Sequence, residues 1–104
     1  MQYQERTRNV KVTLPTTSTK IAEACFQERT QISIINTSTG GETVSIGIGE
    51  EAVANAGIVI YAGGSYSESK GDKSDKITQD VITALGSAAT ATIAIVEKVR
   101  MPVR

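Results

Sequence analysis

Carboxylates are the side chains of this sequence best suited to acid–base chemistry, because the chain contains no histidine and a single cysteine. Glu50 and Glu51 are adjacent, so on a strand they would point to opposite faces of the sheet. A catalytic pair instead needs carboxyl groups that converge across a cleft, roughly 5–10 Å apart. Asp72, Asp75 and Asp80 lack the spacing of a calcium-binding loop and are interleaved with lysines. We therefore expect solvated loops here, with no catalytic residue, no cofactor and no bound metal.

Two other short motifs could carry chemistry, and a structural explanation suits each of them better. Cys25 is the single cysteine, so no disulfide can form within these 104 residues. Because no histidine is present to activate its thiol, we expect a buried, small apolar residue on a strand. Gly47-Ile48-Gly49 lacks the third glycine and the helix of a dinucleotide-binding loop. We interpret these glycines as strand residues that admit a close neighbour.

The composition of the chain excludes several classes of partner. Its 11 basic and 11 acidic residues balance, whereas contacts to nucleic-acid phosphates need a basic surplus. The N-terminal residues are polar, and no apolar run approaches the ~20 residues of a membrane-spanning helix. We therefore expect a protein made in the cytoplasm, without a signal peptide, a membrane partner or a nucleic-acid partner. Hydrophobic residues reach 39% and aromatic residues only 4%, which predicts one thin aliphatic core in a single domain over 1–104.

Alternating apolar and polar residues predict short strands along the whole chain. The predicted strands are 9–14, 21–26, 31–37, 43–49, 58–61, 65–70 and 92–96. Gly40-Gly41 lies between two of them, so we expect a β-hairpin that pairs 31–37 with 43–49. Residues 75–88 combine helical spacing with β-branched residues, and we favour a strand there while a helix stays open. The fold class is thus all-β, a small antiparallel β-sandwich of seven to eight short strands with Ig-like or jelly-roll topology.

Both ends of the chain combine arginines with apolar residues and have few partners in this scheme of strands. We expect residues 1–8 and 98–104 to be extended arms that order against a neighbouring subunit, with frayed termini as the alternative. The candidate interface residues are Tyr3, Arg6, Arg8, Met101 and Val103. A surface with no net charge offers little repulsion between copies, so the arms also predict a homo-oligomer.

Three successive predicted strands in the middle of the chain are separated or closed by glycine-containing segments. Within 29–66, one strand ends at Asn36-Thr37-Ser38, the next contains Ile46-Gly47-Ile48-Gly49, and a third is closed by Gly63-Gly64. The segment 92–97 supplies a closing strand, so the pattern covers about half of the chain. This pattern resembles small β-sandwich proteins encoded among the virion structural genes of tailed bacteriophages.

That resemblance implies a non-enzymatic virion structural protein, namely a capsid decoration or minor capsid protein. Its partners would be the major capsid protein or other virion subunits, and it would be located in the virion after synthesis in the host cytoplasm. Two alternatives stay open. A glycan- or ligand-binding sandwich of the receptor-binding type would use Tyr61 or Tyr66, and an enzyme would have to work with carboxylates alone.

Overall fold

The computed structural model of the chain describes residues 2–24, 28–69 and 77–103, with the backbone alone described at 2–3 and 101–103. The strands in these ranges are β1 (Gln2–Leu14), β2 (Thr19–Ala22), β3 (Glu28–Asn36), β4 (Val44–Ile48), β5 (Ile58–Ile60), β6 (Ser65–Ser69), β7 (Ile82–Gly86) and β8 (Ala91–Val103). The described residues include no helix that could cross a membrane.

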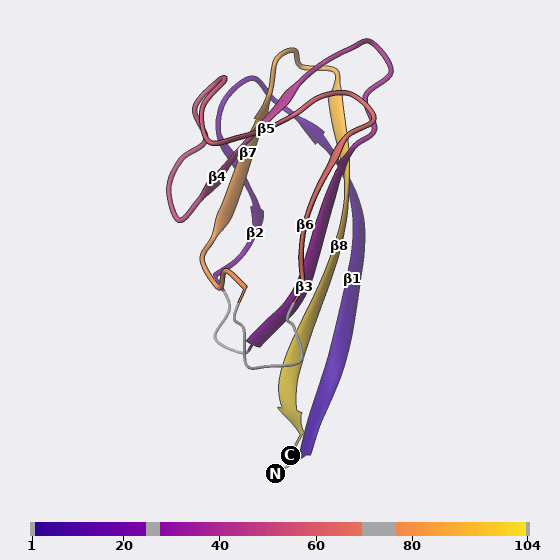
Figure 1. The fold of residues 1–104 in the computed structure, drawn as a ribbon, viewed down its shortest axis with the longest axis vertical. Coiled ribbons are helices and arrows are strands. Elements are labelled where there is room, and N and C mark those ends of the chain that lie inside the picture. Colours follow the sequence, from indigo (N-terminus) through magenta and orange to yellow (C-terminus); the bar gives the residue numbers. More distant parts are fainter. Residues whose placement is uncertain (1, 25–27, 70–76, 104) are drawn as a thin grey trace.

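The eight strands form two four-stranded antiparallel sheets. One sheet has the order β1-β8-β3-β6 and the other has the order β2-β7-β4-β5. Figure 1 shows the two sheets face to face in the upper part of the molecule, with β1 and β8 continuing below. Consecutive strands mostly alternate between the sheets, as in a jelly roll. The predicted all-β sandwich is therefore confirmed, and its topology is that of a jelly roll.

Aliphatic side chains from both sheets fill the space between them. Isoleucine dominates this core, because β-branched side chains fit the pleated surface of a strand and aromatic residues are scarce. Burying one such side chain stabilises the fold by about 1.5–3 kcal/mol. The core residues are Leu14, Ile21, Ala22, Ile32, Ile34, Val44, Ile46, Ile60, Ile77, Ile82, Ala84, Ala91, Ile93 and Ile95.

The predicted hairpin of 31–37 with 43–49 is wrong. β3 pairs with β6 and β8, whereas β4 pairs with β5 and β7, so the two strands lie in opposite sheets. Each strand has an apolar face that must be buried. Both faces are buried equally well when the strands pack against each other from opposite sheets as when they pair side by side in one sheet. Gly40-Gly41 therefore lies in an arch between the sheets.

A buried asparagine holds this arch in place. The Asn36 Nδ2 atom donates hydrogen bonds to the carbonyl oxygens of Glu42 and Ile60, both at 2.9 Å. Its Oδ1 atom accepts a bond from the Ser38 amide at 3.0 Å. Asn36 is fully buried, so its polar atoms must find partners inside the protein, and all three of these partners lie in or beside the connections between sheets.

Two other segments differ from their predicted boundaries. In 75–88, the strand that we favoured is limited to β7, and the described residues before it, from Ile77 to Val81, form an irregular segment. The predicted strand 21–26 corresponds to β2, which begins at Thr19 and ends at Ala22. Cys25, predicted to be buried on that strand, lies outside the described residues.

The terminal segments pair with each other. β1 and β8 are both 13 residues long, and their register runs without interruption from Gln2 opposite Val103 to Leu14 opposite Ala91. The described parts of the two predicted arms therefore form a β-ribbon, whose last residues extend past the core. This ribbon brings both termini to one end of the longest axis, which measures 46 Å (Figure 1).

Neighbouring residues on β3 give a direct test of the sandwich. Ile34 is fully buried and Ile35, on the opposite face, is 39% exposed. We expect Ile34→Ala to lower the free energy of unfolding by about 2–5 kcal/mol because it opens a cavity in the core. Ile35→Ala should cost about 1 kcal/mol or less. Urea denaturation measures both values, and equal losses for the two variants would contradict the register of β3.

Candidate functional site

The most unusual cluster of charges in the structure surrounds the carboxylate of Glu97 on β8. Arg29 Nε donates to Glu97 Oε2 at 2.7 Å, and Arg8 Nε donates to Glu97 Oε1 at 2.9 Å. Arg29 is fully buried and Glu97 nearly so, while Arg8 is partly exposed. The three residues come from β3, β8 and β1, which are neighbours in the first sheet.

Both guanidinium groups reach past the first sheet to the backbone that leads into or out of the second. Arg29 donates to the carbonyl oxygens of Glu23, Thr78 and Asp80 at 2.7, 2.8 and 3.1 Å. Arg8 Nη2 donates to the carbonyl oxygen of Ile21 on β2 at 3.0 Å. A buried arginine is tolerated only when it is paired and its donors find acceptors. Arg29 is paired with Glu97, and four of its five N–H donors have an acceptor. We name Arg8, Arg29 and Glu97 the charge clamp, because they join the two sheets at the end where the core stops.

A glutamine strengthens the same junction. The Arg29 amide donates to Gln79 Oε1 at 2.6 Å, and Gln79 Nε2 donates to the carbonyl oxygens of Arg29 and Ile77, both at 3.0 Å. Main chain and side chain of Arg29 are thus both bound to 77–80. Four of the five N–H donors of the Arg29 guanidinium are used in the contacts above, which suits a structural role.

The sequence contained part of the signal for the charge clamp. Arg8 has the same parity as Val10 and Val12, and Glu97 has the same parity as Ile93 and Ile95, so alternation places both charges on the core face. A charge in line with core residues indicates a buried ion pair. Arg29 could not be found in this way. The register of β3 with β8 shifts between Arg29 and Gln31, so the odd-numbered Arg29 faces the core although the core residues after the shift are even-numbered.

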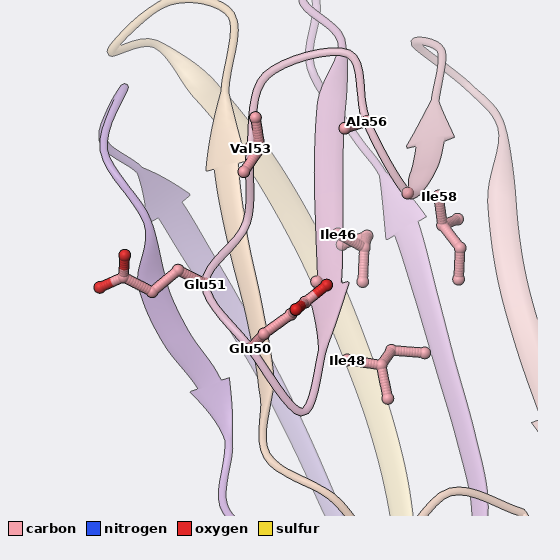
Figure 2. A pocket seen from close by; sticks show the side chains of 9 residues that line it. Ile46, Ile48, Glu50, Glu51, Val53, Ala56 and Ile58 are labelled. Carbon is pink, nitrogen blue, oxygen red and sulfur yellow. The ribbon is translucent and has the colours of Figure 1, made fainter.

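The adjacent carboxylates lie beside an open groove of about 240 Å³, formed by β4, the 49–57 loop and the start of β5. In Figure 2, Glu50 points toward the isoleucines of β4 and Glu51 points away from them. The two carboxyl groups do not converge on one point, as their adjacency predicts. Among the described residues, no group of three or more acidic or cysteine side chains is placed to hold a metal ion.

Side-chain hydrogen bonds hold the loop that forms this groove. Thr83 Oγ1 donates to the carbonyl oxygen of Glu50 at 2.7 Å, Ser18 Oγ accepts from the Ala52 amide at 2.9 Å, and Ser45 Oγ accepts from the Asn55 amide at 3.0 Å. A Cβ atom at Gly47 would lie 2.8 Å from both the Glu50 carbonyl oxygen and Thr83 Oγ1. Gly47 is thus a strand glycine that admits a close neighbour.

Of the tyrosines proposed for glycan contact, one lies in a connection between strands and the other lies on a strand. Tyr61 follows β5 and is 72% exposed. Tyr66 is on β6, where its ring packs against the core. Burial raises the pKa of Tyr66 well above its usual value of 10, and the neighbouring Glu68 adds to this rise. Tyr66 is therefore a packing residue.

Of the five candidate interface residues, Tyr3, Met101 and Val103 lie on the ribbon beyond the end of β3, and Arg6 lies level with Arg29 of the charge clamp. Tyr3 is opposite Pro102, Met101 is opposite Gln4, Val103 is opposite Gln2, and Arg6 is opposite Val99. The Arg6 side chain is exposed, and the side chains of Tyr3, Met101 and Val103 lie outside the described part of the structure. Arg8 is instead a member of the charge clamp.

The outer edge of β1 pairs with no strand of the described residues, and the direction of its peptide groups follows from β8. The Thr92 carbonyl oxygen accepts from the Thr37 amide, and the Thr92 amide donates to Ser38 Oγ, both at 3.0 Å, so Thr92 points toward the β3 side. Because peptide groups alternate along a strand, odd-numbered residues of β8 point toward β1 and pair with its even-numbered residues. The odd-numbered residues of β1 therefore direct their amides and carbonyls to the open edge.

Comparisons with known proteins give a match at the level of the fold. No model of a known protein family matches the chain, and no curated protein is a significant relative. Among solved structures, the chain is similar to a protein of Bacillus endospore appendages, which are described as a novel family of disulfide-linked pili. The TM-score is 0.59 at 20% identity, and the match covers 98% of this chain and 89% of that chain. At this identity, the similarity shows the fold alone.

This match corrects the resemblance to virion proteins of tailed bacteriophages. The predictions of a capsid decoration or minor capsid protein, of a major capsid protein as its partner, and of a location in the virion are wrong, because the fold matched over nearly the whole chain is that of a pilus protein. The pattern in 29–66 describes how strands end in a jelly roll, and it does not distinguish one jelly-roll family from another. The glycan-binding alternative is set aside with it.

The charge clamp can be tested by removing its buried member. We expect Arg29→Met to lower the free energy of unfolding by about 3–5 kcal/mol, because carbonyl groups and part of the Glu97 carboxylate lose their partner. Lys20→Met is the control, since Lys20 pairs with Glu23 at 2.8 Å in an exposed position and should contribute about 0–1 kcal/mol. Thermal and urea unfolding measure both variants, and a loss for Arg29→Met as small as that of the control would refute the clamp.

Proposed function

We propose that the protein is a non-enzymatic structural subunit that polymerises with copies of itself into a pilus-like appendage. The observation that carries this proposal is the open edge of β1. The fold match to a pilus protein supports it, because the same jelly roll serves there over nearly the same length of chain. The absence of net charge also supports it, since copies of the chain repel one another little at long range.

β1 lacks most of the features by which edge strands avoid pairing with other chains. Natural edges are protected by short length, prolines, bulges or charges. The other sheet follows this rule, because its edge strands β2 and β5 have four and three residues. β1 has 13 residues, contains no proline, and is paired with β8 without a bulge. Such a strand offers a second copy a long ladder of backbone hydrogen bonds, which is how strand addition generates affinity.

The single cysteine of these 104 residues limits what they can contribute to disulfides between subunits. The protein that matches is described as part of disulfide-linked pili. A chain of subunits joined throughout by disulfides needs two sulfur atoms per subunit, and these 104 residues supply one. A bond between two Cys25 residues would join subunits in pairs and go no further. Beyond such a pair, the contacts that these residues make between subunits are non-covalent.

Proline at position 11 tests the open edge. The Lys11 amide points away from β8, so Lys11→Pro should remove one donor from the edge while leaving the β1–β8 ladder intact. We expect the wild-type protein to form filaments visible by negative-stain electron microscopy. Lys11→Pro should remain monomeric by light scattering across the same concentration series.

Lys11→Ala is the matched control, because it removes the same side chain and keeps the amide. It should polymerise like the wild type. Circular dichroism and thermal unfolding establish that all three proteins are folded. A Lys11→Pro variant that is folded and polymerises normally would refute pairing at this edge, and a wild-type protein that stays monomeric at every concentration would refute the proposed function.

A further inference from the structure

We propose that the groove beside β4 and β5 receives the tip of the β1–β8 ribbon from a second copy of the chain. This inference rests on the proposed function, since it identifies a second contact within the same polymer. It starts from a concave apolar surface that the fold itself leaves uncovered. Ile46, Ile48, Val53 and Ile58 line the groove, and Val53 is 61% exposed.

The groove is preformed and small. Its outer wall, the 49–57 loop, donates hydrogen bonds to Ser18 and Ser45 and accepts one from Thr83. A site that is already shaped loses little conformational entropy when it binds. Its volume of about 240 Å³ is less than the roughly 300–1,000 Å³ of small-molecule pockets. The groove therefore suits one or two side chains of a protein partner.

The rim of the groove is acidic. Glu50 and Glu51 both line it, both are exposed, and neither forms an ion pair with any cation in the described parts of the chain. An occupant that combines an apolar side chain with a cation would complement this surface.

The ribbon has this combination near its tip, where Arg6 supplies the cation and the half-buried Val99 supplies the apolar side chain. Arg6 is exposed and lies opposite Val99 on β8, and Gln4, two residues before it, is also exposed. By alternation, Gln4 and Arg6 occupy the face of β1 that carries Val10 and Val12 higher up, where those residues pack against the core. The side chains of Gln4 and Arg6 are exposed on this face, whereas Val10 and Val12 are half-buried. This end of the core face is thus available to another copy.

The groove and the tip of the ribbon lie at different places on the subunit, which determines whether copies form a closed ring or an open filament. Both termini lie at the lower end of the molecule, and the connection between β4 and β5 lies in its upper half (Figure 1). A contact between two different surfaces of the same subunit is heterologous, and it propagates from copy to copy into an open filament unless the rotation closes a ring. Each copy would supply one groove and one ribbon tip.

Disulfide trapping tests this contact directly. In a Cys25→Ala background, we combine Val53→Cys in the groove with Gln4→Cys on the ribbon and assemble the protein under mild oxidation. The expected result on a non-reducing gel is a ladder of trimers and larger species, because each subunit can bond to two neighbours. Variants with Val53→Cys or Gln4→Cys alone should stop at dimers. Filaments that form without such a ladder would overturn the inference.

A charge exchange gives a second, independent readout. We expect Glu50→Lys to raise the concentration needed for assembly about tenfold or more, because the lysine would face Arg6. Adding Arg6→Glu should restore assembly, and Thr39→Lys, which places a lysine at an exposed position outside the groove, should leave it unchanged. If Glu50→Lys polymerises like the wild type, the groove contact is refuted while polymerisation stands. If the wild type does not polymerise, both proposals fail.

Discussion

The charge clamp is the interaction on which the rest of the structure depends. The aliphatic core stops at Ile95 on β8, and two residues later the same face presents Glu97 in place of a hydrophobic side chain. Arg29 and Arg8 neutralise this carboxylate and donate further hydrogen bonds to carbonyl groups of the second sheet and its flanking segments. The sandwich is thereby closed by charge-assisted hydrogen bonds at the point where β1 and β8 leave it. This closure allows the ribbon to continue beyond the core without exposing the core to water.

Asn36 closes the opposite end in a related way. It is fully buried and binds the arch after β3 to the end of β5, so that the chain crosses between sheets at a fixed point. With both ends held by buried polar groups, the thin core is protected although the chain has few aromatic residues. What these closures leave open are surfaces at the sides, namely the outer edge of β1 and the groove beside β4. A subunit that is rigid at its ends and open at its edges is well suited to assembly by strand addition.

The sequence predicts the fold class well because strand periodicity is a local property. The alternation of Val10, Val12 and Leu14, or of Ile93 and Ile95, requires no knowledge of neighbours. Pairing is not local, and the hairpin across Gly40-Gly41 was wrong because an arch between sheets has the same local signature as a turn within one sheet. The side-chain bonds of Asn36 that decide between them connect residues up to 24 positions apart. Arg29 was missed for a similar reason, since a bulge after it changes which residues of β3 face the core.

The central claim is that the odd-numbered residues of β1 provide hydrogen-bonding groups for a second copy. Residue-resolved amide hydrogen exchange, compared between monomer and assembled protein, tests it most directly. We expect the amides of Asn9, Lys11 and Thr13 to exchange quickly in the monomer and to become protected in the polymer. The amides of Val10 and Val12, which face β8, should be protected in both states. Odd-numbered amides that exchange equally fast before and after assembly would contradict the claim.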